Sequence, residues 1–270
     1  MCIFASGKSK KMPKPQRRLW TREELILTLS VYFQLPFGRL NRTTPEVREL
    51  AKVLGRSDNS AALRLVNFAA CDPYIINSGR TGMTSGIPVC KPIWDEFADD
   101  KERLFSEAQR IKAALLNKPI EVTLNLSVGE LEGKERAAVI QQRINQNVFR
   151  TMVLQNYEEH CAITGINIPE LLVAGHIIPW ADSTPQQRLC PENGICLSSL
   201  YDKAFDKGLF TISPDNYTVI LSSALREYDT QEYFDEHFGR IAGKPITMPI
   251  EHKPNRDFLA YHRDHVFVGA

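Results

Sequence analysis

Three segments that lie close together in the sequence carry polar side chains within a pattern of two strands and a helix. They read Gly175-His176-Ile177-Ile178-Pro179-Trp180, Asn193-Gly194-Ile195-Cys196-Leu197 and Tyr201-Asp202-Lys203-Ala204-Phe205-Asp206. The first two are short apolar runs typical of strands, and the third is typical of a helix start. A helix would place Asp202 and Asp206 on one face, because they are four residues apart. The pattern therefore predicts a small hairpin followed by a helix, arranged around a metal ion.

Each polar residue taken alone has a common structural explanation. A single histidine beside apolar residues is most often a hydrogen-bonded core residue, and Asn before Gly is usually a turn former. An Asp pair at helical spacing is usually solvated or caps a helix. The order and the spacing favour a functional role, since Asn193 precedes Asp202 by nine positions and Asp206 by thirteen.

Further motifs flank these segments on both sides. They are Phe149-Arg150 to Tyr157, Cys161-Ala162-Ile163-Thr164-Gly165, Arg188 to Leu197, Asp202 to Leu209 and Phe258-Leu259-Ala260-Tyr261-His262-Arg263. Together the motifs resemble the HNH, or ββα-metal, endonuclease family, in particular its restriction endonuclease branch. Three N-terminal motifs resemble the helical domain that often precedes this nuclease, namely Trp20-Thr21-Arg22-Glu23-Glu24-Leu25, Leu54-Gly55-Arg56-Ser57 and Asn67-Phe68-Ala69. The resemblance covers nearly the whole chain and is most specific from Cys161 to Leu209.

The resemblance implies a DNA endonuclease that leaves 5′-phosphate and 3′-hydroxyl ends. Matched position by position, His176 is the general base, and Asn193 braces the loop that orients it. Asp202 takes the place of the family's final histidine, and Asp206 that of a metal ligand four residues later. Where many members carry Asp or His directly before the base, this chain has Gly175. Water or the Asn193 side chain is then expected to complete the metal coordination.

The cofactor expected from this ligand set is one divalent cation. Carboxylate ligands favour a hard ion such as Mg²⁺ or Mn²⁺. No structural zinc is expected, because the six cysteines form no CxxC pair. A neutral imidazole can deprotonate water near neutral pH. We therefore expect His176, Asp202 and Asp206 to converge around a single ion.

The N-terminal part has the start and stop signals of several helices. Two of the predicted helices flank Gly55 and resemble a helix-turn-helix, with Ser60, Arg64 and Asn67 on the second one. Arg and Asn in a major groove read base edges, so these three residues are predicted to contact DNA. Plain packing in a helical bundle is the alternative. Closer to the nuclease motifs, Arg150, Arg188 and Lys207 are predicted phosphate contacts, with simple surface charge as the alternative.

The expected fold class is α+β, with an N-terminal helical domain followed by a ββα-metal nuclease domain. The expected parts are a basic flexible tail (1–18), a helical DNA-binding domain (19–116), a strand and hinge linker (117–133) and a nuclease domain (134–270, core 160–225). Within them we predict one long amphipathic helix from Lys91 to Leu116, a half-buried strand over 120–128 from the alternating apolar residues, and a helix from Lys134 to Glu159.

Composition narrows the class of protein. The 270 residues are 43% hydrophobic and 24% charged, which excludes a wholly disordered chain. No apolar run reaches the roughly 18–20 residues that cross a bilayer, and Met1 to Lys14 lacks the apolar segment of a secretory signal. We therefore expect a cytoplasmic protein whose cysteines are thiols, buried as small apolar residues.

Charge is unevenly distributed although the formal net charge is only +1. Residues 1–60 hold 12 Lys or Arg against 5 Asp or Glu. A basic tail of this kind suits a polyanion such as DNA, and a solvated terminus is the alternative.

Two functions besides a restriction or phage-defence endonuclease remain open. A DNA-binding regulator with a decayed nuclease motif is motivated by Gly175 and the missing final histidine. An RNA or structure-specific nuclease would show no preference for duplex sequence. For the endonuclease, one site of this type cuts one strand, so a double-strand break leads us to expect a homodimer on DNA.

Overall fold

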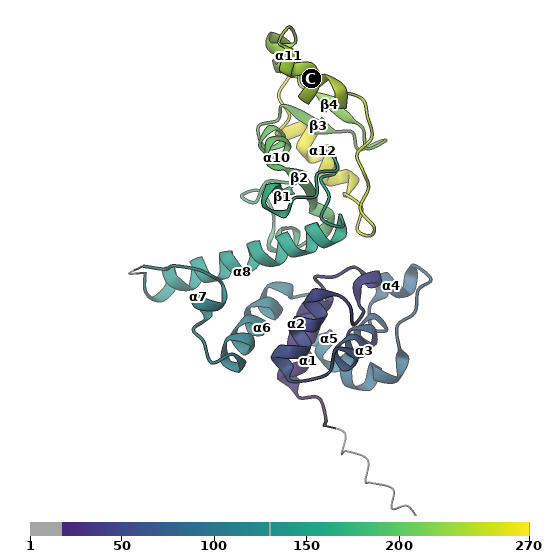
Figure 1. The fold of residues 1–270 in the computed structure, drawn as a ribbon, viewed down its shortest axis with the longest axis vertical. Helices are drawn as coiled ribbons and strands as arrows, with labels where there is room; N and C mark the ends of the chain where they lie inside the picture. Colours follow the sequence, from purple (N-terminus) through teal and green to yellow (C-terminus); the bar gives the residue numbers. More distant parts are fainter. Residues whose placement is uncertain (1–17, 130, 270) are drawn as a thin grey trace, which may run out of the picture.

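The computed structural model describes residues 18–129 and 131–269, and most of the predicted basic tail lies outside these ranges. Helices make up the N-terminal half of the described chain, and two antiparallel hairpins lie in the C-terminal half among further helices (Figure 1). The α+β class predicted from the sequence is confirmed. Among the described residues, no helix combines the length and the apolar content needed to cross a bilayer.

The elements follow each other in a simple order. The N-terminal helices are α1 (Arg22–Tyr32), α2 (Pro45–Leu54), α3 (Asp58–Ala69), α4 (Pro73–Asn77), α5 (Ile87–Phe97), α6 (Lys101–Leu115) and α7 (Ile120–Thr123). The C-terminal elements are α8 (Gly133–Asn156), β1 (Leu172–His176), α9 (Pro185–Arg188), β2 (Gly194–Ser198), α10 (Ser199–Asp206), β3 (Phe210–Ile212), β4 (Val219–Leu221), α11 (Glu232–His237) and α12 (Arg256–His265). Short 3-10 helices occupy Phe37–Arg39, Thr84–Gly86, Pro169–Leu171, Pro191–Asn193, Ser223–Tyr228 and Gly239–Ile241.

Local sequence signals set the boundaries of the first helices. Thr21 caps α1 in a capping box with Glu24, which satisfies two backbone N–H groups at the helix start. Gly55 ends α2 with φ of +60°, a left-handed conformation that glycine adopts without strain. The apolar faces of α1, α2, α3, α5 and α6 then bury one continuous core that includes Leu29, Leu65 and Phe97.

Two elements predicted from the sequence differ from the structure: one predicted helix is two helices, and one predicted strand is a helix. The predicted helix from Lys91 to Leu116 is divided into α5 and α6, because the Asp100 side chain accepts a hydrogen bond from the Arg103 N–H and starts a new helix. The predicted strand over 120–128 is instead the short helix α7 followed by a turn. Its alternating residues also satisfy a helical spacing: Ile120 and Leu124 are four residues apart, and both pack against a small core shared with α6 and α8.

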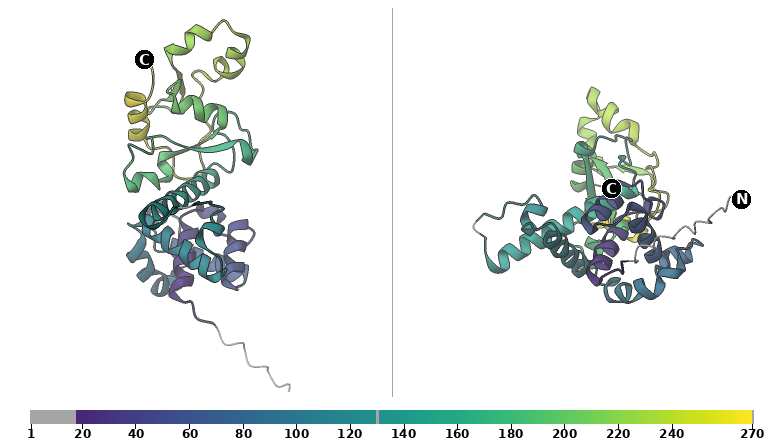
Figure 2. Two further views of the ribbon diagram at one scale, coloured as in Figure 1. Left: turned by 90° about the vertical axis from the view of Figure 1, so that its left-hand side faces the viewer. Right: turned by 60° about the horizontal axis from the view of Figure 1, so that its bottom comes forward.

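Helix α8 lies between the N-terminal helices and the C-terminal hairpins, as both figures show (Figures 1 and 2). Its residues Ile144 and Val148 pack with Phe105 of α6. Phe149 and Val153 belong to the core of the C-terminal part. The helix therefore has two apolar faces, one packed into each core, and it joins the two cores.

A second set of contacts joins the two halves beyond the end of α8. Glu251 accepts a hydrogen bond from the backbone N–H of Phe37 at 3.1 Å and pairs with Arg80. The His252 ring stacks on Tyr74 with 4.5 Å between ring centroids. Because the Glu251 side chain is only 8% exposed, this ion pair is shielded from solvent on its acidic side. We call this set of contacting residues the interdomain clamp; it consists of Phe37, Tyr74, Arg80, Glu251 and His252.

The cysteines that the structure describes form no disulfide. Four of them are buried, as predicted, namely Cys71, Cys90, Cys161 and Cys196. Cys190 is partly exposed.

Gly194 is required for the close approach of β2 to α8. A Cβ atom at this position would lie 2.2 Å from Cγ2 of Val153 and 3.0 Å from Cζ of Phe149. We expect Gly194→Ala to lower the free energy of unfolding by about 1–3 kcal/mol, because overpacking displaces core side chains. Urea unfolding measures this, with Gly38→Ala as the control because a Cβ there meets nothing within 4 Å. Equal stability of the two variants would contradict the expectation.

His262 of α12 makes the stability of the C-terminal part dependent on pH. The ring is buried, stacks on Phe205, and has Nδ1 2.9 Å from the Thr211 hydroxyl. Burial lowers the pKa of His262 to about 4. The unfolded chain therefore binds a proton that the folded chain does not, and stability present above pH 6.5 is lost as the pH falls towards 4.

We expect this residue to account for a loss of roughly 3 kcal/mol between those pH values. The measurement is the free energy of unfolding against pH for the unmodified protein and for His262→Gln, whose curve should be flatter. His160→Gln serves as the control, because that ring is exposed. A His262→Gln curve parallel to that of the unmodified protein would count against the assignment.

Candidate active site

Two paired strands and a helix form the site, but the strand predicted over 175–180 is misplaced. It ends at His176, because the Ile178 N–H donates to the Asn193 side chain and Pro179 has no N–H to offer a neighbouring strand. β1 and β2 are antiparallel, with Gly175 opposite Ile195 and His176 opposite Gly194. Ser198 is both the last residue of β2 and the N-cap of α10, so the helix starts without an intervening loop. This short connection holds α10 against the hairpin and brings Asp202 next to β1.

His176, at the end of β1, is held on three sides. Its ring stacks on Phe149 of α8 with 3.6 Å between centroids and 12° between the planes. The ring meets Trp180 edge-on at 5.5 Å. Its Nε2 lies 3.2 Å from the carbonyl oxygen of Arg188. These contacts fix both the position and the rotation of the imidazole.

The Arg188 carbonyl also determines which nitrogen of His176 is free. A carbonyl oxygen only accepts, so Nε2 carries the hydrogen and Nδ1 keeps its lone pair. Burial lowers the pKa of His176 to about 4, although the bond to Arg188 acts in the opposite direction. The imidazole is therefore neutral near pH 7, with Nδ1 able to accept a proton.

Asn193 braces the loop between β1 and β2. Its side chain is completely buried, and its Oδ1 accepts from the Ile178 N–H at 2.8 Å. Its Nδ2 donates to the carbonyl of Gln187 at 3.2 Å and is also within range of the Ser183 hydroxyl at 3.3 Å. Because Gln187 precedes Arg188, Asn193 indirectly positions the carbonyl that holds His176.

The same contacts exclude one predicted role of Asn193. Both side-chain atoms are used within the loop, and the residue has no exposed surface. The expectation that the Asn193 side chain completes a metal site is therefore wrong in this structure, because a ligand atom must be free to face the ion.

Asp202 and Asp206 lie one turn apart on α10. A Cβ atom on Gly175 would be 2.8 Å from Oδ1 of Asp202, so this carboxylate occupies the space beside β1 that a larger residue would fill. Burial and then the nearby charge of Asp206 raise the pKa of Asp202 to about 6. Asp206 is exposed. Within the described chain, neither carboxylate forms a hydrogen bond or ion pair with a side chain of opposite charge.

The two carboxylates suit a hard divalent cation. Mg²⁺ commonly binds to one or two protein carboxylates and takes its other ligands from water and phosphate. A half-buried carboxylate with a raised pKa and no cationic partner, such as Asp202, gains from such an ion. Across residues 18–129 and 131–269, however, no three His, Cys, Asp or Glu side chains are grouped as metal ligands. Asp202 and Asp206 therefore stay the predicted protein ligands.

The structure does not bring the His176 ring into contact with these acids. Successive residues of a strand point to opposite sides, and while position 175 faces Asp202, the ring at 176 faces Phe149 and Trp180. Direct contact between the imidazole and the two acids is therefore not seen, and their convergence around one ion stays a prediction.

Two of the three residues predicted to read DNA bases have structural roles. Asn67 is buried and donates from Nδ2 to the Met83 carbonyl at 2.9 Å. Arg64 lies over the Trp20 ring at 4.8 Å, and its Nη1 is 3.7 Å from Sγ of Cys90. The prediction for Asn67 is wrong, because α3 turns this side chain into the core, whereas Arg64 is partly exposed and its DNA contact stays a prediction. Ser60 stays partly exposed near the start of α3.

The three side chains predicted to contact phosphate differ in whether they already bind to groups of the protein. Arg150 donates to the carbonyls of Leu172 and Pro169, so it ties α8 to the start of β1. Arg188 donates from Nε to the Trp180 carbonyl and lies over that ring at 4.9 Å. Lys207, at the end of α10, is exposed. Of the three, Lys207 is the most available for a phosphate.

Sequence reasoning missed the groups that hold the His176 ring. The Phe149 ring stacks on His176, yet its motif position alone does not distinguish it from a core residue. The partner of Nε2 is a backbone carbonyl, which leaves no trace in the sequence. Only the Asn193 motif carried a usable signal for this part of the site.

Comparison with known proteins supports the local assignment. The search of curated proteins finds no match. A family model described as HNH endonuclease matches residues 161–213, which include β1, β2, α10 and β3. His176, Asn193, Asp202 and Asp206 all lie within the matched range. Residues 161–213 therefore form a domain of the HNH endonuclease family.

Proposed function

We propose that this chain is a metal-dependent DNA endonuclease that hydrolyses phosphodiester bonds. The observation that carries the proposal is the state of His176: neutral, with Nε2 bound to a carbonyl and Nδ1 free. It lies beside a hairpin whose following helix presents two carboxylates without cationic partners. This combination is what hydrolysis of a phosphodiester by an activated water requires.

In the proposed reaction, Nδ1 of His176 removes a proton from a water molecule as its oxygen attacks phosphorus. The P–O3′ bond breaks on the opposite side, which leaves a 5′-phosphate and a 3′-hydroxyl after the 3′ oxygen takes up a proton from solvent. The negative phosphodiester raises the pKa of His176 when DNA is bound, because an opposite charge favours the protonated ring. This brings the base closer to the range in which proton transfer is effective.

Asp202 and Asp206 would hold the cation, Mg²⁺ or Mn²⁺. When bound, such an ion supplies positive charge against the phosphate oxygens and the departing 3′ oxygen. Asn193 keeps the loop and the Arg188 carbonyl in place, and so acts as a positioning residue for His176.

We further propose a division of roles along the chain, with DNA binding in the helical part (19–116) and cleavage in the C-terminal part (134–270). Lys207 and Ser60 are candidates for DNA contacts, because both are accessible. A restriction or phage-defence role, and a homodimer that cuts both strands of a duplex, are the finer expectations from the family resemblance and from one site per strand.

The alternative of a regulator with a decayed nuclease is less well supported. Decay should first remove polar residues of the site, yet His176, Asn193, Asp202 and Asp206 are all present. A regulator would also need side chains that read bases, and one predicted reader, Asn67, is buried in the core.

The test is plasmid cleavage with Mg²⁺, Mn²⁺ or EDTA. We expect relaxed or linear DNA as the product with either metal and no cleavage with EDTA. The two carboxylates are negative, so they cannot neutralise the charge of the phosphate without the ion. Cleavage in EDTA would overturn the metal-dependent assignment. Single-stranded and structured RNA in the same assay distinguish the third function, and methylated against unmethylated DNA tests the restriction role.

A further inference from the structure

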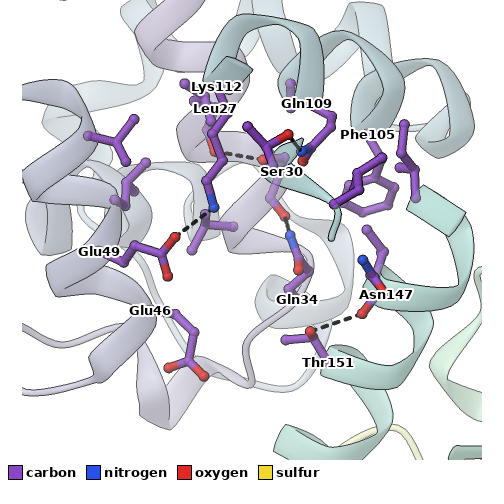
Figure 3. Close-up of a pocket in the computed structure, with 18 residues that line it drawn as sticks. Leu27, Ser30, Gln34, Glu46, Glu49, Phe105, Gln109, Lys112, Asn147 and Thr151 are labelled. Carbon is purple, nitrogen blue, oxygen red and sulfur yellow. Dashed lines mark hydrogen bonds and ion pairs between the residues drawn. The ribbon is translucent and has the colours of Figure 1, made fainter. Parts of the chain in front are cut away.

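A cavity of about 290 Å³ lies among α1, α2, α6, α7 and α8, and none of His176, Asn193, Asp202 and Asp206 lines it (Figure 3). Its apolar wall includes Leu27, Leu50, Phe105 and Val148. An engineered cavity of roughly 150 Å³ with such a wall holds benzene. The space is therefore large enough for a ring and a short side chain.

The polar side of the cavity carries an excess of negative charge. Its charged lining residues are Glu46, Glu49 and Lys112, a formal total of one negative charge. Lys112 pairs with Glu49 at 2.6 Å. Glu46 has no cationic partner among the described residues: its Oε1 accepts from Gln155 Nε2 at 3.0 Å, and its Oε2 is buried without a hydrogen bond.

Uncharged hydrogen-bonding groups surround this carboxylate. Figure 3 shows Glu46 and Glu49 on one side of the cavity, Asn147 and Thr151 on the other, and Gln34 between them. Gln34 donates to the Ser30 carbonyl, which leaves its own side-chain oxygen as an acceptor. A ligand in this space thus meets an apolar wall, acceptors and one unneutralised carboxylate.

We propose that this cavity binds a small organic cation, a primary amine on an apolar body the size of one ring. The ammonium group supplies the missing positive charge beside Glu46 and three hydrogen-bond donors for the surrounding acceptors. The terminal torsion of a glutamate is soft, so its carboxylate can turn towards such a donor. The apolar body fills the space between α1, α6 and α8 that no side chain occupies.

The ligand would also stabilise the packing of α8. Ile144 and Val148 line the cavity from α8, while Leu27 and Leu50 line it from α1 and α2. A molecule that contacts all of these binds the folded chain and not the unfolded one, which raises the melting temperature. This effect does not depend on cleavage.

The test uses the full chain and three probes: 2-phenylethylamine, its neutral isostere 2-phenylethanol, and the anion 3-phenylpropionate. Calorimetry and methyl NMR of Val53, Val148 and Leu27 should show saturable binding of the amine at one site per chain. Binding should be about tenfold weaker for the alcohol, and undetectable for the acid, because a hydrogen-bonded ion pair is lost or reversed.

Two variants test the site itself. Glu46→Gln removes the charge but keeps the acceptor for Gln155, and it should weaken amine binding about tenfold. Ala108→Leu extends a side chain into the apolar part of the cavity and should abolish amine binding. This variant tests the site if Glu46→Gln does not fold. Glu227→Gln, an exposed acid in the C-terminal part, is the matched control and should bind as the unmodified protein does. No saturable amine binding, equal affinity for amine and alcohol, or shifts confined to other methyl groups would each overturn the proposal.

Discussion

Replacing His176 with alanine is expected to slow DNA cleavage by about 10²–10⁴-fold while DNA binding changes little. The structure fixes this imidazole in place beside the hairpin through Phe149, Trp180 and the Arg188 carbonyl. Removing the ring leaves the carboxylates and the loop intact, so substrate and cation can still bind. The loss should therefore fall on the chemical step.

Single-turnover cleavage of an oligonucleotide duplex at saturating protein measures this step directly. Added imidazole should restore part of the rate of His176→Ala, because a small base can occupy the space left by the ring. His160→Ala, which changes an exposed histidine that bonds only to the Glu158 carbonyl, is the matched control. An alanine variant at His176 that cleaves as fast as the unmodified protein would remove the general-base assignment.

Asp202→Asn is expected to act in opposite directions on function and on stability. Without the carboxylate, cation binding should weaken by at least about tenfold and cleavage should be nearly lost, because charge neutralisation at the phosphate depends on the ion. The metal-free protein should become more stable by about 1 kcal/mol at pH 7. The raised pKa of Asp202 means that folding disfavours its ionised form, and the amide removes that penalty.

The two effects can be measured on the same samples. Titration with Mn²⁺, followed by electron paramagnetic resonance, reports cation binding, and urea unfolding in EDTA reports stability. Asp215→Asn is a suitable control, since it changes an exposed acid away from α10. A variant at Asp202 that binds Mn²⁺ as well as the unmodified protein, or that is less stable in EDTA, contradicts this account.

The sequence was most informative where local pattern and spacing agree. The second strand and the helix lie where the apolar run and the spacing of the two Asp residues predicted them, whereas the first strand ends at His176 instead of continuing to Trp180. This part succeeded because the hairpin and the helix follow each other directly, so nearly all of its geometry is local. The bracing role of Asn193 was implied by the family resemblance alone, because the sequence does not show that this side chain is buried.

Prediction failed where distant segments decide the role of a residue. Asn67 has the residue type and helical position of a base reader, but its partner Met83 is supplied by another part of the chain. Sequence spacing cannot indicate which face of α3 that segment covers.

The segment around α7 failed for a related reason. Its alternating apolar residues fit a strand as well as a helix, and only packing against α6 and α8 selects the helix. The Arg188 carbonyl that holds the His176 ring shows a further limit, since the sequence does not indicate which backbone carbonyl a side chain will bind.

The interdomain clamp has a consequence for where along DNA a cut would fall. Glu251 and His252 fix the C-terminal part to Phe37, Arg80 and Tyr74, and α8 joins both cores, so no long tether separates His176 from the N-terminal helices. If the N-terminal helices bind a duplex, as proposed, the His176 ring would lie at one constant distance along the DNA from the bound sequence. Gel electrophoresis of end-labelled DNA after cleavage should then show a single sharp band rather than a ladder, because a fixed distance between binding and cleavage gives one product length.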